Sequence, residues 1–528
     1  MPSFNVLTDP WIVAQSRDGT LRESSLLEVL ERAHELDSLV DAAPTIQLGL
    51  YRLLIAFVMD ALDLREMDDV GSALARGRFA PSDLQSYADR VGRARFDLFD
   101  NEHPFLQNGG ASASQEKTKS VAELFFHLPT GTNVVHFHHM NADDHGLSPA
   151  VCARALCALS PFMTSGGQGY SPSINGTPPW YVLIRGSSLF RTLLLNCYAA
   201  TDLGLRHDAP PAWCSDQPVV PKQVQSCRSL LEGLTWRARS VRLLPGDGGV
   251  CTYSGKPSAI LVRSMLFGPG FKVDGGNWTD PQVAYRTSEK GRLPMRPRED
   301  REVWRDTGPL LLLREADYAS ARGQVRFARP AVVDQLRQLE RERYLDTGGK
   351  ETYEVYGVRA DKAKVFEWQY ERLTLPEGIG RNSTAGEQAQ QGIEMADSVA
   401  RILGHAVKRA YPRAGVGNEQ AFARVVQRAQ SQYWSALKRR FTAELLQGLA
   451  EQDPDDGAAR LHLAAGWNAA LRKEGGSALE AAIGPLDSDA EALIQQQDAV
   501  AYFRREIARL LDPPETISGQ VKRRREGQ

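Results

Sequence analysis

Four of the ten histidines fall in one short stretch of the sequence, and metal binding is the first chemistry that such a cluster suggests. The stretch contains His136, His138, His139 and His145, with Asp143 and Asp144 between them and Cys152 and Cys157 beyond. Imidazole and carboxylate groups are zinc ligands, but no H-x-x-x-H or C-x-x-C spacing directs them toward one ion. Two interpretations stay open: a metal-dependent hydrolase that uses the cluster from His136 to His145, and a polar surface loop that orders against a partner.

The glycine-rich segment 164–169 is the second place where residue types suggest binding. Gly166, Gly167 and Gly169 leave the backbone bare, so another molecule can approach its amide groups closely. No Lys-Ser or Lys-Thr pair follows the segment, and its glycines do not form G-x-G-x-x-G, so neither nucleotide-binding fingerprint is present. A tight connection with positive φ angles would use the same glycines, and this alternative stays open.

The remaining motifs do not demand catalysis. The sequence has no G-x-S-x-G elbow, no H-E-x-x-H helix and no calcium-binding loop. Two unusual phrases, residues 5–12 and 101–107, contain Asp9 and His103 beside prolines and aromatic residues. We interpret both phrases as core or turn segments, in which an acid and a histidine would at most form a buried polar pair.

Length and composition indicate a folded protein of at least two domains. The chain has 528 residues, of which 42% are hydrophobic and 24% charged, and a net charge of -2. This balance predicts no overall attraction to a polyanion, so any contact with nucleic acid must be local. Six irregularly spaced cysteines, a start without a signal sequence and apolar runs shorter than the roughly 20 residues of a membrane helix predict a cytoplasmic protein without a membrane partner.

The elements that position these residues change in character near residue 375. Residues 1–375 mix short apolar runs, typical of buried strands at 182–184 and 259–262, with helical spacing at 45–62 and 150–163. Residues 376–528 are rich in Ala, Gln, Arg and Leu, and we place helices near 384–411, 418–450, 457–473 and 487–511. Breakers at 412–415, 454–457, 475–476 and 484–485 mark the turns between them. The sequence therefore predicts an α+β (mixed) N-terminal domain followed by an all-α four-helix bundle.

The second predicted helix carries an uneven charge. Between residues 401 and 450 the sequence has nine Lys and Arg against two Glu, and the sign reverses over the next fifty residues. Arg424, Arg428 and Arg439 share one face of this helix, because their spacings are close to whole helical turns. This stripe would bind a phosphate backbone or pair with an acidic third helix, and both interpretations stay open.

Taken in order along the chain, several phrases resemble the CasA family, the large subunit of the type I-E CRISPR surveillance complex Cascade. The resemblance is carried by residues 7–12, 102–107, 166–169, 176–178, 185–186, 189–196 and 233–236, and it covers most of the chain. It implies a protein without catalytic activity or cofactor that reads the protospacer-adjacent motif of double-stranded DNA and starts strand separation. It also implies contact with the 5′ handle of the guide RNA and with other Cascade subunits, and recruitment of a nuclease-helicase in antiviral defence.

The resemblance also assigns roles to individual residues. It implies that the backbone of the glycine segment enters the minor groove, where readout is degenerate, and that a lysine beside it probes the same groove. It places a strand-opening wedge at a β-hairpin tip, where Lys362 stands in place of the family's glutamine. The residues implied for DNA are Ser165, Gly166, Gly167, Gln168, Gly169, Lys272, Lys362, Ala363, Arg424, Arg428 and Arg439, and those for RNA are Phe137, His138 and His139.

Overall fold

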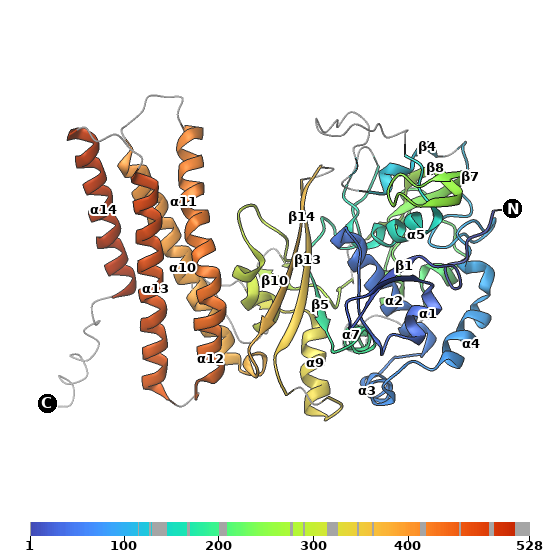
Figure 1. The fold of residues 1–528 in the computed structure, drawn as a ribbon, viewed down its shortest axis with the longest axis horizontal. Coiled ribbons are helices and arrows are strands. Elements are labelled where there is room, and N and C mark those ends of the chain that lie inside the picture. The colour runs from blue at the N-terminus through green and yellow to red at the C-terminus, as the bar shows by residue number, and fades with distance from the viewer. Residues whose placement is uncertain are drawn as a thin grey trace. The chain divides into compact units, whose positions relative to one another are not determined.

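The computed structural model of the chain divides into two units (Figure 1). The N-terminal unit contains Met1–Val303 and Pro309–Thr374, and the helical unit contains Trp304–Gly308 and Leu375–Gln528. The structure describes residues 2–114, 116–125, 128, 145–165, 169–199, 209–274, 278–288, 291–313, 326–345, 348–361, 364–411, 419–453, 456–484 and 490–512.

The described residues of the N-terminal unit form five small sheets. Two sheets have the strand orders β2 (Leu21–Ser24), β1 (Ile12–Ser16), β3 (Leu36–Leu39) and β4 (Lys117–Ser120), β8 (Pro257–Pro269), β7 (Arg239–Val250). Two more have the orders β14 (Lys364–Leu375), β13 (Glu351–Asp361), β5 (Tyr181–Arg185) and β11 (Gly291–Pro294), β10 (Tyr285–Ser288), β12 (Arg326–Ala328). The last is the parallel pair β6 (Val224–Gln225) and β9 (Lys272–Val273). The predicted strands at 182–184 and 259–262 lie in β5 and β8. Both predictions are confirmed.

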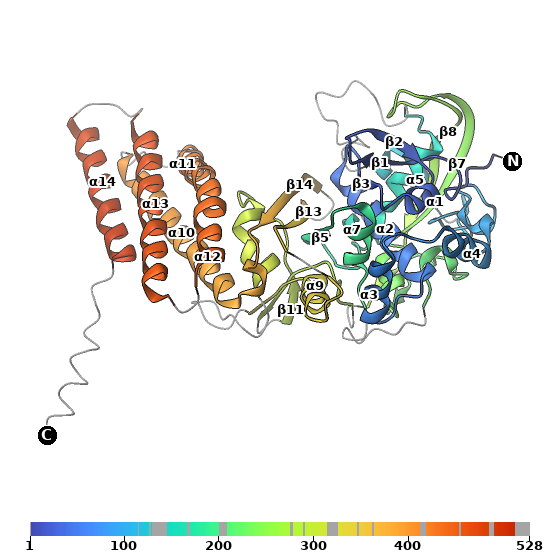
Figure 2. The same cartoon turned by 60° about the horizontal axis from the view of Figure 1, so that its bottom comes forward.

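Helices of the N-terminal unit pack between and around these sheets (Figure 2). They are α1 (Leu26–Glu31), α2 (Pro44–Ala61), α3 (Met67–Arg76), α4 (Pro81–Val91), α5 (Pro149–Cys157), α6 (Leu159–Phe162), α7 (Leu189–Asn196), α8 (Leu230–Leu234) and α9 (Ala331–Arg341). Helix α2 is buried along most of its length, so it forms the centre of this core. The helical spacing at 45–62 corresponds to α2, and that at 150–163 corresponds to α5 and α6. The mixed class predicted from the sequence is confirmed.

The helical unit consists of long helices that lie side by side in both views (Figures 1 and 2). They are α10 (Ser383–Ala410), α11 (Glu419–Arg440), α12 (Gln447–Glu451), α13 (Gly457–Ile483) and α14 (Ala490–Leu511), and a π-helical segment, Phe441–Leu446, joins α11 to α12. Each long helix has apolar residues at helical spacing on one face, and residues of these faces are buried, for example Leu403 of α10, Leu437 of α11 and Phe503 of α14. The four predicted helical segments are present.

The predicted end of the third helix is wrong. Helix α13 passes through Gly475 and Gly476 and ends at Ile483. A Cβ atom on Gly475 would lie 2.8 Å from Cζ of Phe503 and 3.2 Å from Cγ1 of Val399. Gly475 therefore allows neighbouring helices to approach closely and does not mark a turn. The other predicted breakers at 412–415 and at Pro485 lie outside the described residues.

A short segment that precedes β13 in the sequence belongs to the helical unit. The ring of Trp304 is buried against Trp434 and Phe441, with ring centroids 5.9 and 5.2 Å apart. The guanidinium group of Arg305 lies 3.5 Å from the centre of the Trp434 ring and pairs with Asp397. The sequence did not predict this contribution, because composition does not change at residues 304–308. Within the described residues, every helix is too short or too polar to cross a membrane.

Candidate nucleic-acid interface

The glycine segment connects α6 to β5, and the structure describes its two ends. Ser165 is half-buried, and Gly169 is exposed with a φ angle of +90°, in the region that favours glycine. Gly166, Gly167 and Gln168 lie outside the described residues. The positive φ of Gly169 agrees with the interpretation as a tight connection, and the exposure of Gly169 agrees with close approach of a ligand.

The base of the glycine segment is fastened by one buried arginine. Arg239, at the start of β7, is 7% exposed, and its guanidinium group donates to the carbonyl oxygen of Thr164 at 2.5 Å and to that of Ser171 at 2.6 Å. The backbone N–H of Ser173 donates to the carbonyl oxygen of Met163 at 2.7 Å. The backbone on both sides of the segment is therefore bound to the core of the N-terminal unit.

An aromatic stack supports the same arginine. The ring of Tyr170 lies 5.1 Å from the Arg239 guanidinium and is stacked on Phe267, with ring centroids 6.1 Å apart. The ammonium group of Lys119 lies 5.8 Å from the Tyr170 ring, although Glu123 pairs with this lysine at 2.6 Å. The residue that follows Gly169 is therefore held by a ring and two cations.

The cation nearest to Gly169 is Lys222. A Cβ atom on Gly169 would meet Cε of Lys222 and would lie 2.9 Å from its Nζ. Lys222 is exposed, has a φ angle of +64°, and donates its backbone N–H to the carbonyl oxygen of Gly270 at 3.2 Å. Lys272, the lysine implied by the resemblance, is exposed on β9, where Val224 of β6 is its pairing partner. Lys222 therefore crosses the described end of the glycine segment.

Arg237 lies two residues before Arg239 on the chain and is a further cation of the N-terminal unit. Arg237 packs over the Phe271 ring at 5.2 Å and donates to Oγ of Ser215 at 3.2 Å. Burial lowers the pKa of both Arg237 and Arg239 to about 10, so both stay charged at neutral pH. Neither forms an ion pair with a carboxylate among the residues that the structure describes. Arg239 is buried and bound to carbonyl oxygens, so of the two arginines only the half-buried Arg237 reaches the surface.

The turn after the glycine segment is tied to a fully buried ion pair. Arg52 and Asp280 are 1% and 0% exposed and pair at 2.9 Å. The side-chain amide of Asn175 donates to the same Asp280 carboxylate at 2.9 Å, and the indole N–H of Trp278 donates to the Asn175 oxygen at 2.7 Å. Residues far apart in the sequence thus hold this turn in one position.

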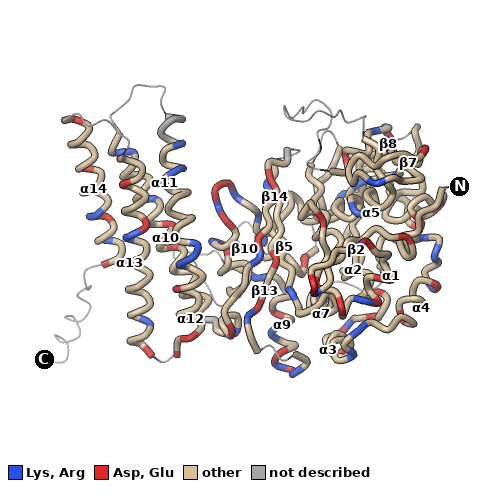
Figure 3. Tube along the Cα trace, viewed as in Figure 1, with Lys and Arg blue, Asp and Glu red and all other residues tan. Residues whose placement is uncertain are grey.

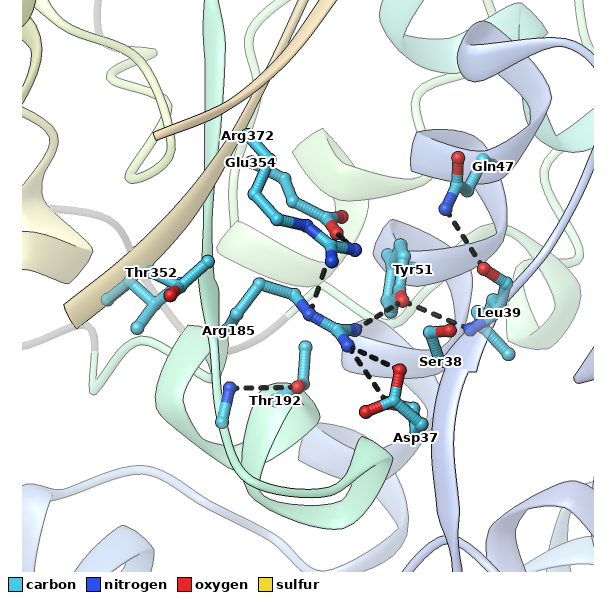
Figure 4. Close-up of polar contacts among 12 residues, drawn as sticks. Asp37, Ser38, Leu39, Gln47, Tyr51, Arg185, Thr192, Thr352, Glu354 and Arg372 are labelled. Atoms are coloured by element: carbon cyan, nitrogen blue, oxygen red, sulfur yellow. Dashed lines mark hydrogen bonds and ion pairs between the residues drawn. The ribbon is translucent and has the colours of Figure 1, made fainter. Parts of the chain in front are cut away.

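The wedge assigned by the resemblance corresponds to the connection between β13 and β14. Lys362 and Ala363 lie outside the described residues, between the ends of these two paired strands. The base of the hairpin is held by a polar cluster (Figure 4) in which the buried Glu354 carboxylate accepts from Arg372 at 2.8 Å and pairs with Arg185 at 3.5 Å. Arg185 also donates to Tyr51 at 3.0 Å, which connects the hairpin to α2.

Of the four histidines in the cluster, the structure describes His145 alone. Phe137, His138 and His139 lie outside the described residues, as does His136. His145 is 5% exposed, and its Nδ1 lies 3.4 Å from Oγ1 of Thr252, so it belongs to a packed core region. Among the residues that the structure describes, no three His, Cys, Asp or Glu side chains converge as metal ligands.

The basic stripe of α11 is exposed. Arg424, Arg428 and Arg439 face solvent, and Figure 3 shows Lys and Arg toward both ends of this helix. Within the described part of the chain none of the three forms an ion pair. Instead, Arg440 pairs with Glu474 of α13 at 2.9 Å. The alternative in which the stripe pairs with the third helix is therefore wrong, because the paired arginine lies on another face.

The two conspicuous sequence phrases have structural roles. The Trp11 indole is fully buried and donates to the carbonyl oxygen of Val6 at 2.8 Å. The buried Gln107 amide donates to Leu98 and accepts from the backbone N–H of Leu243 at 2.7 Å. His103 is half-exposed, 3.8 Å from Asp216, and does not pair with Asp9. These phrases shape the fold, as their prolines and aromatic residues predicted.

Sequence reasoning missed Lys222 and Arg239. Lys222 lies in no motif, and Arg239 is more than sixty residues from the backbone groups that it binds. No local pattern marks either residue, since both contacts arise from tertiary folding. Pro221 and Gln223 flank Lys222 and indicate a loop, but they do not indicate which residue the lysine contacts.

Comparison with known proteins supports one family. The family model for the CRISPR-associated protein Cse1 matches residues 5–478. The CRISPR-associated protein CasA/Cse1 of Thermus thermophilus is 30% identical over 422 residues, which is 77% of each chain. The solved structure of Thermus thermophilus CasA (Cse1) has a TM-score of 0.71 at 26% identity and covers 96% of this chain and 100% of its own. A chain of a CRISPR RNA-guided surveillance complex has a TM-score of 0.73 at 22% identity, covering 96% and 100%.

Fold and comparisons together define the class as that of CRISPR-associated proteins. The chain belongs to the Cse1 family, also called CasA. This confirms the resemblance to the large subunit of type I-E Cascade that the ordered phrases carried.

Proposed function

We propose that this protein is the subunit of an RNA-guided DNA surveillance complex that recognises the motif beside the target in double-stranded DNA. The observation that carries the proposal is the exposed Gly169 at the end of the glycine segment, with Lys222 across it and the flanking carbonyl groups of Thr164 and Ser171 bound by Arg239. Bare backbone enters a minor groove about 6 Å wide more easily than side chains do. Because this groove distinguishes few base pairs, recognition there is permissive.

The hairpin of β13 and β14 supports the second step, strand separation. Lys362 and Ala363 occupy its tip by sequence, and the Glu354 cluster holds its base in the core. A hairpin whose base is held in the core is suited to inserting side chains between the base pairs next to the motif. Lysine binds phosphate or a groove acceptor but cannot donate and accept as the amide of glutamine does.

Further partners follow from the same family. We assign contact with the 5′ handle of the guide RNA to Phe137, His138 and His139, because an aromatic ring beside imidazoles suits base stacking. We assign the stripe of Arg424, Arg428 and Arg439 to a DNA phosphate track or to the small subunits. The protein would act in the cytoplasm without chemistry of its own and would help to recruit a nuclease-helicase.

The hydrolase alternative that uses the cluster from His136 to His145 is not favoured. The matching family is a CRISPR-associated one, and His145 packs against Thr252. Metal analysis of the purified protein, together with thermal unfolding in the presence of a chelator, separates the two functions. Stoichiometric zinc, manganese or iron would support the hydrolase.

The decisive experiment compares two glycines in the assembled complex with guide RNA. Gly169→Leu and Gly255→Leu each place a side chain at an exposed position with positive φ, +90° and +69°, but only the first meets Lys222. We expect Gly169→Leu to reduce the preference for motif-bearing over motif-free duplex by about tenfold, the scale of one lost specific contact. Gly255→Leu is expected to keep that preference. Unchanged discrimination in both variants would reject the glycine segment as the reading element.

The hairpin is tested by separating binding from opening. Lys362→Ala is expected to slow strand separation, measured with a fluorescent base analogue beside the motif, more than it weakens initial duplex binding. Equal losses in the two measurements would contradict a wedge.

A further inference from the structure

The turn that carries Lys222 is bound to a neighbouring segment of the chain. We call residues 219–223 the lysine turn. The backbone N–H of Lys222 donates to the carbonyl oxygen of Gly270 at 3.2 Å, and the carbonyl oxygen of Gln223 accepts from the backbone N–H of Lys272 at 2.8 Å. These two hydrogen bonds hold the backbone on both sides of the Lys222 side chain, whose residue has a φ angle of +64°.

The start of the lysine turn is held by one buried side chain, that of Asn108. Asn108 is 4% exposed and directly follows the phrase 101–107. Its amide nitrogen donates to the carbonyl oxygen of Val219 at 3.1 Å, and its amide oxygen accepts from the backbone N–H of Val219 at 3.3 Å. One side chain therefore satisfies both backbone groups of Val219, as a neighbouring strand would.

Asn108 also connects the lysine turn to the strand that binds the glycine segment. Its amide nitrogen donates to Oγ of Ser240 at 2.7 Å, and its backbone N–H donates to the carbonyl oxygen of Val241 at 2.8 Å. Both residues belong to β7 and follow Arg239, which binds carbonyl oxygens on both sides of the glycine segment. The lysine turn and the flanks of the glycine segment are thus bound to adjacent residues of one strand.

This arrangement places a cation against the exposed end of the glycine segment. Nζ of Lys222 lies 2.9 Å from the position that a Cβ atom on Gly169 would take. Lys222 is exposed and forms no ion pair with a carboxylate of the described residues. If the backbone of Gly169 enters a minor groove about 6 Å wide, a group beside it lies at the wall of that groove. Phosphates line this wall, so an ammonium group without a carboxylate partner meets an anion there.

We propose that Lys222 binds a phosphate oxygen of the target DNA at the edge of the groove that Gly169 approaches, and that Asn108 is the positioning residue for this lysine. The inference rests on the proposed function of the glycine segment. An ammonium group is a point charge on a flexible stem, so its place depends on the backbone that carries it. Lys222 therefore adds affinity that does not depend on sequence, and the buried Asn108 acts through the lysine turn.

The first test measures how duplex affinity depends on salt in the assembled complex with guide RNA. Lys222→Gln is expected to lower the slope of log affinity against log salt by about 0.9, the contribution of one phosphate contact. The preference for motif-bearing over motif-free duplex should stay, because a phosphate contact carries no sequence information. Lys222→Arg should keep the slope. Lys256→Gln is the control and should also keep it, because Lys256 is exposed but pairs with Glu23 at 2.9 Å.

The second test separates positioning from stability. Asn108→Ala keeps Lys222 but releases Val219, so we expect the slope to fall by up to about 0.9. The double variant Asn108→Ala/Lys222→Gln should show no lower slope than Lys222→Gln alone. Asn196 is the matched control, because it is 2% exposed and its amide donates to the carbonyl oxygen of Ile184 at 2.8 Å and accepts from the backbone N–H of Ile184 at 3.0 Å. Asn196→Ala should lower the melting temperature as Asn108→Ala does, but it should keep the slope.

Several results would overturn the phosphate contact. An unchanged slope in Lys222→Gln would do so, as would an equal fall in Lys256→Gln. Loss of motif preference in Lys222→Gln at an unchanged slope would assign the lysine to a base edge, which also contradicts the proposal. If the wild-type complex shows no motif preference while Lys222→Gln still lowers the slope, the proposed reading function fails but the phosphate contact stands.

The positioning role has its own contradicting results. An unchanged slope in Asn108→Ala, or an equal fall in Asn196→Ala, would show that Asn108 does not position the lysine. If Asn108→Ala does not assemble, Ser240→Ala removes the hydroxyl group that binds the Asn108 amide and should lower the slope in the same direction. An unchanged slope in Ser240→Ala would then reject the connection through β7.

Discussion

The N-terminal unit buries paired charges, whereas helices α10 to α14 bury almost only apolar side chains. In the first unit Arg52, Asp280 and Glu354 are at most 1% exposed, and each has a charged partner. Among the described residues of α10 to α14, Gln390 is the one polar side chain that is buried. Helices α10 to α14 therefore pack mainly through apolar contacts, and the buried charges of their unit lie in the segment 304–308, where Arg305 pairs with Asp397.

The difference shows what a loop-based site requires. A charge removed from water must find its partner, so a buried pair specifies one arrangement of the segments that carry it. Arg52 and Asp280 are 228 residues apart in sequence and together hold the turn after the glycine segment. Apolar helix faces specify position less strictly, because neighbouring aliphatic side chains can replace one another.

The largest expected effect breaks the buried pair. Arg52→Met leaves Asp280 buried without its cation, and we expect the free energy of unfolding to fall by about 3–5 kcal/mol in urea denaturation. Arg76→Met is the control, because its partner Asp83 and Arg76 itself are both exposed. That variant is expected to change stability by about 1 kcal/mol or less. Similar losses in the two variants would show that burial does not set how much an ion pair contributes to stability.

A middle-sized effect tests close packing in the helical unit. Gly475→Leu forces a side chain against Phe503 and should destabilise the protein by about 1–3 kcal/mol. A Cβ atom on the neighbouring Gly476 would have no atom within 4 Å, so Gly476→Ala should stabilise α13 by about 1 kcal/mol through helix propensity. Thermal unfolding of the full chain measures both changes. Stabilisation by Gly475→Leu would show that the helices do not need this glycine.

The smallest effect on stability concerns the exposed stripe of α11. Arg424→Gln, Arg428→Gln and Arg439→Gln should each change the free energy of unfolding by no more than about 0.5 kcal/mol. If the stripe follows a phosphate backbone, each change should lower the salt slope of DNA binding by about 0.9. Arg440→Gln is the control, since Glu474 already neutralises this residue. A slope that responds to Arg440 and not to the other three would contradict the phosphate track.

The positions of the helices were easier to predict from the sequence than the places where they end. The periodicity of apolar residues predicted α2, α10, α11 and α14 closely, because one buried face repeats every three or four residues. The end of α13 was missed, since a glycine that allows close packing looks in sequence like one that ends a helix.

The candidate site was predictable only in part. The glycine segment and the hairpin tip were found from residue type and family resemblance. The Arg239 contacts, Lys222 over Gly169 and the entry of Trp304 into the helical unit had no local signal. Each depends on which distant segment the folded chain brings near.

Residue order alone indicates where the main helices of this protein lie and where glycines cluster, because those properties depend on neighbours a few positions away, but it did not indicate where α13 ends. The tertiary structure decides which Lys and Arg side chains lack an ion-pair partner and which loops are bound to the core by hydrogen bonds. Arg237 and Arg440 are the same residue type in the sequence, yet Arg237 packs on the Phe271 ring without a described ion pair and Arg440 is neutralised by Glu474. The reason is that charge acts through space, so its effect is set by distances that only the fold defines.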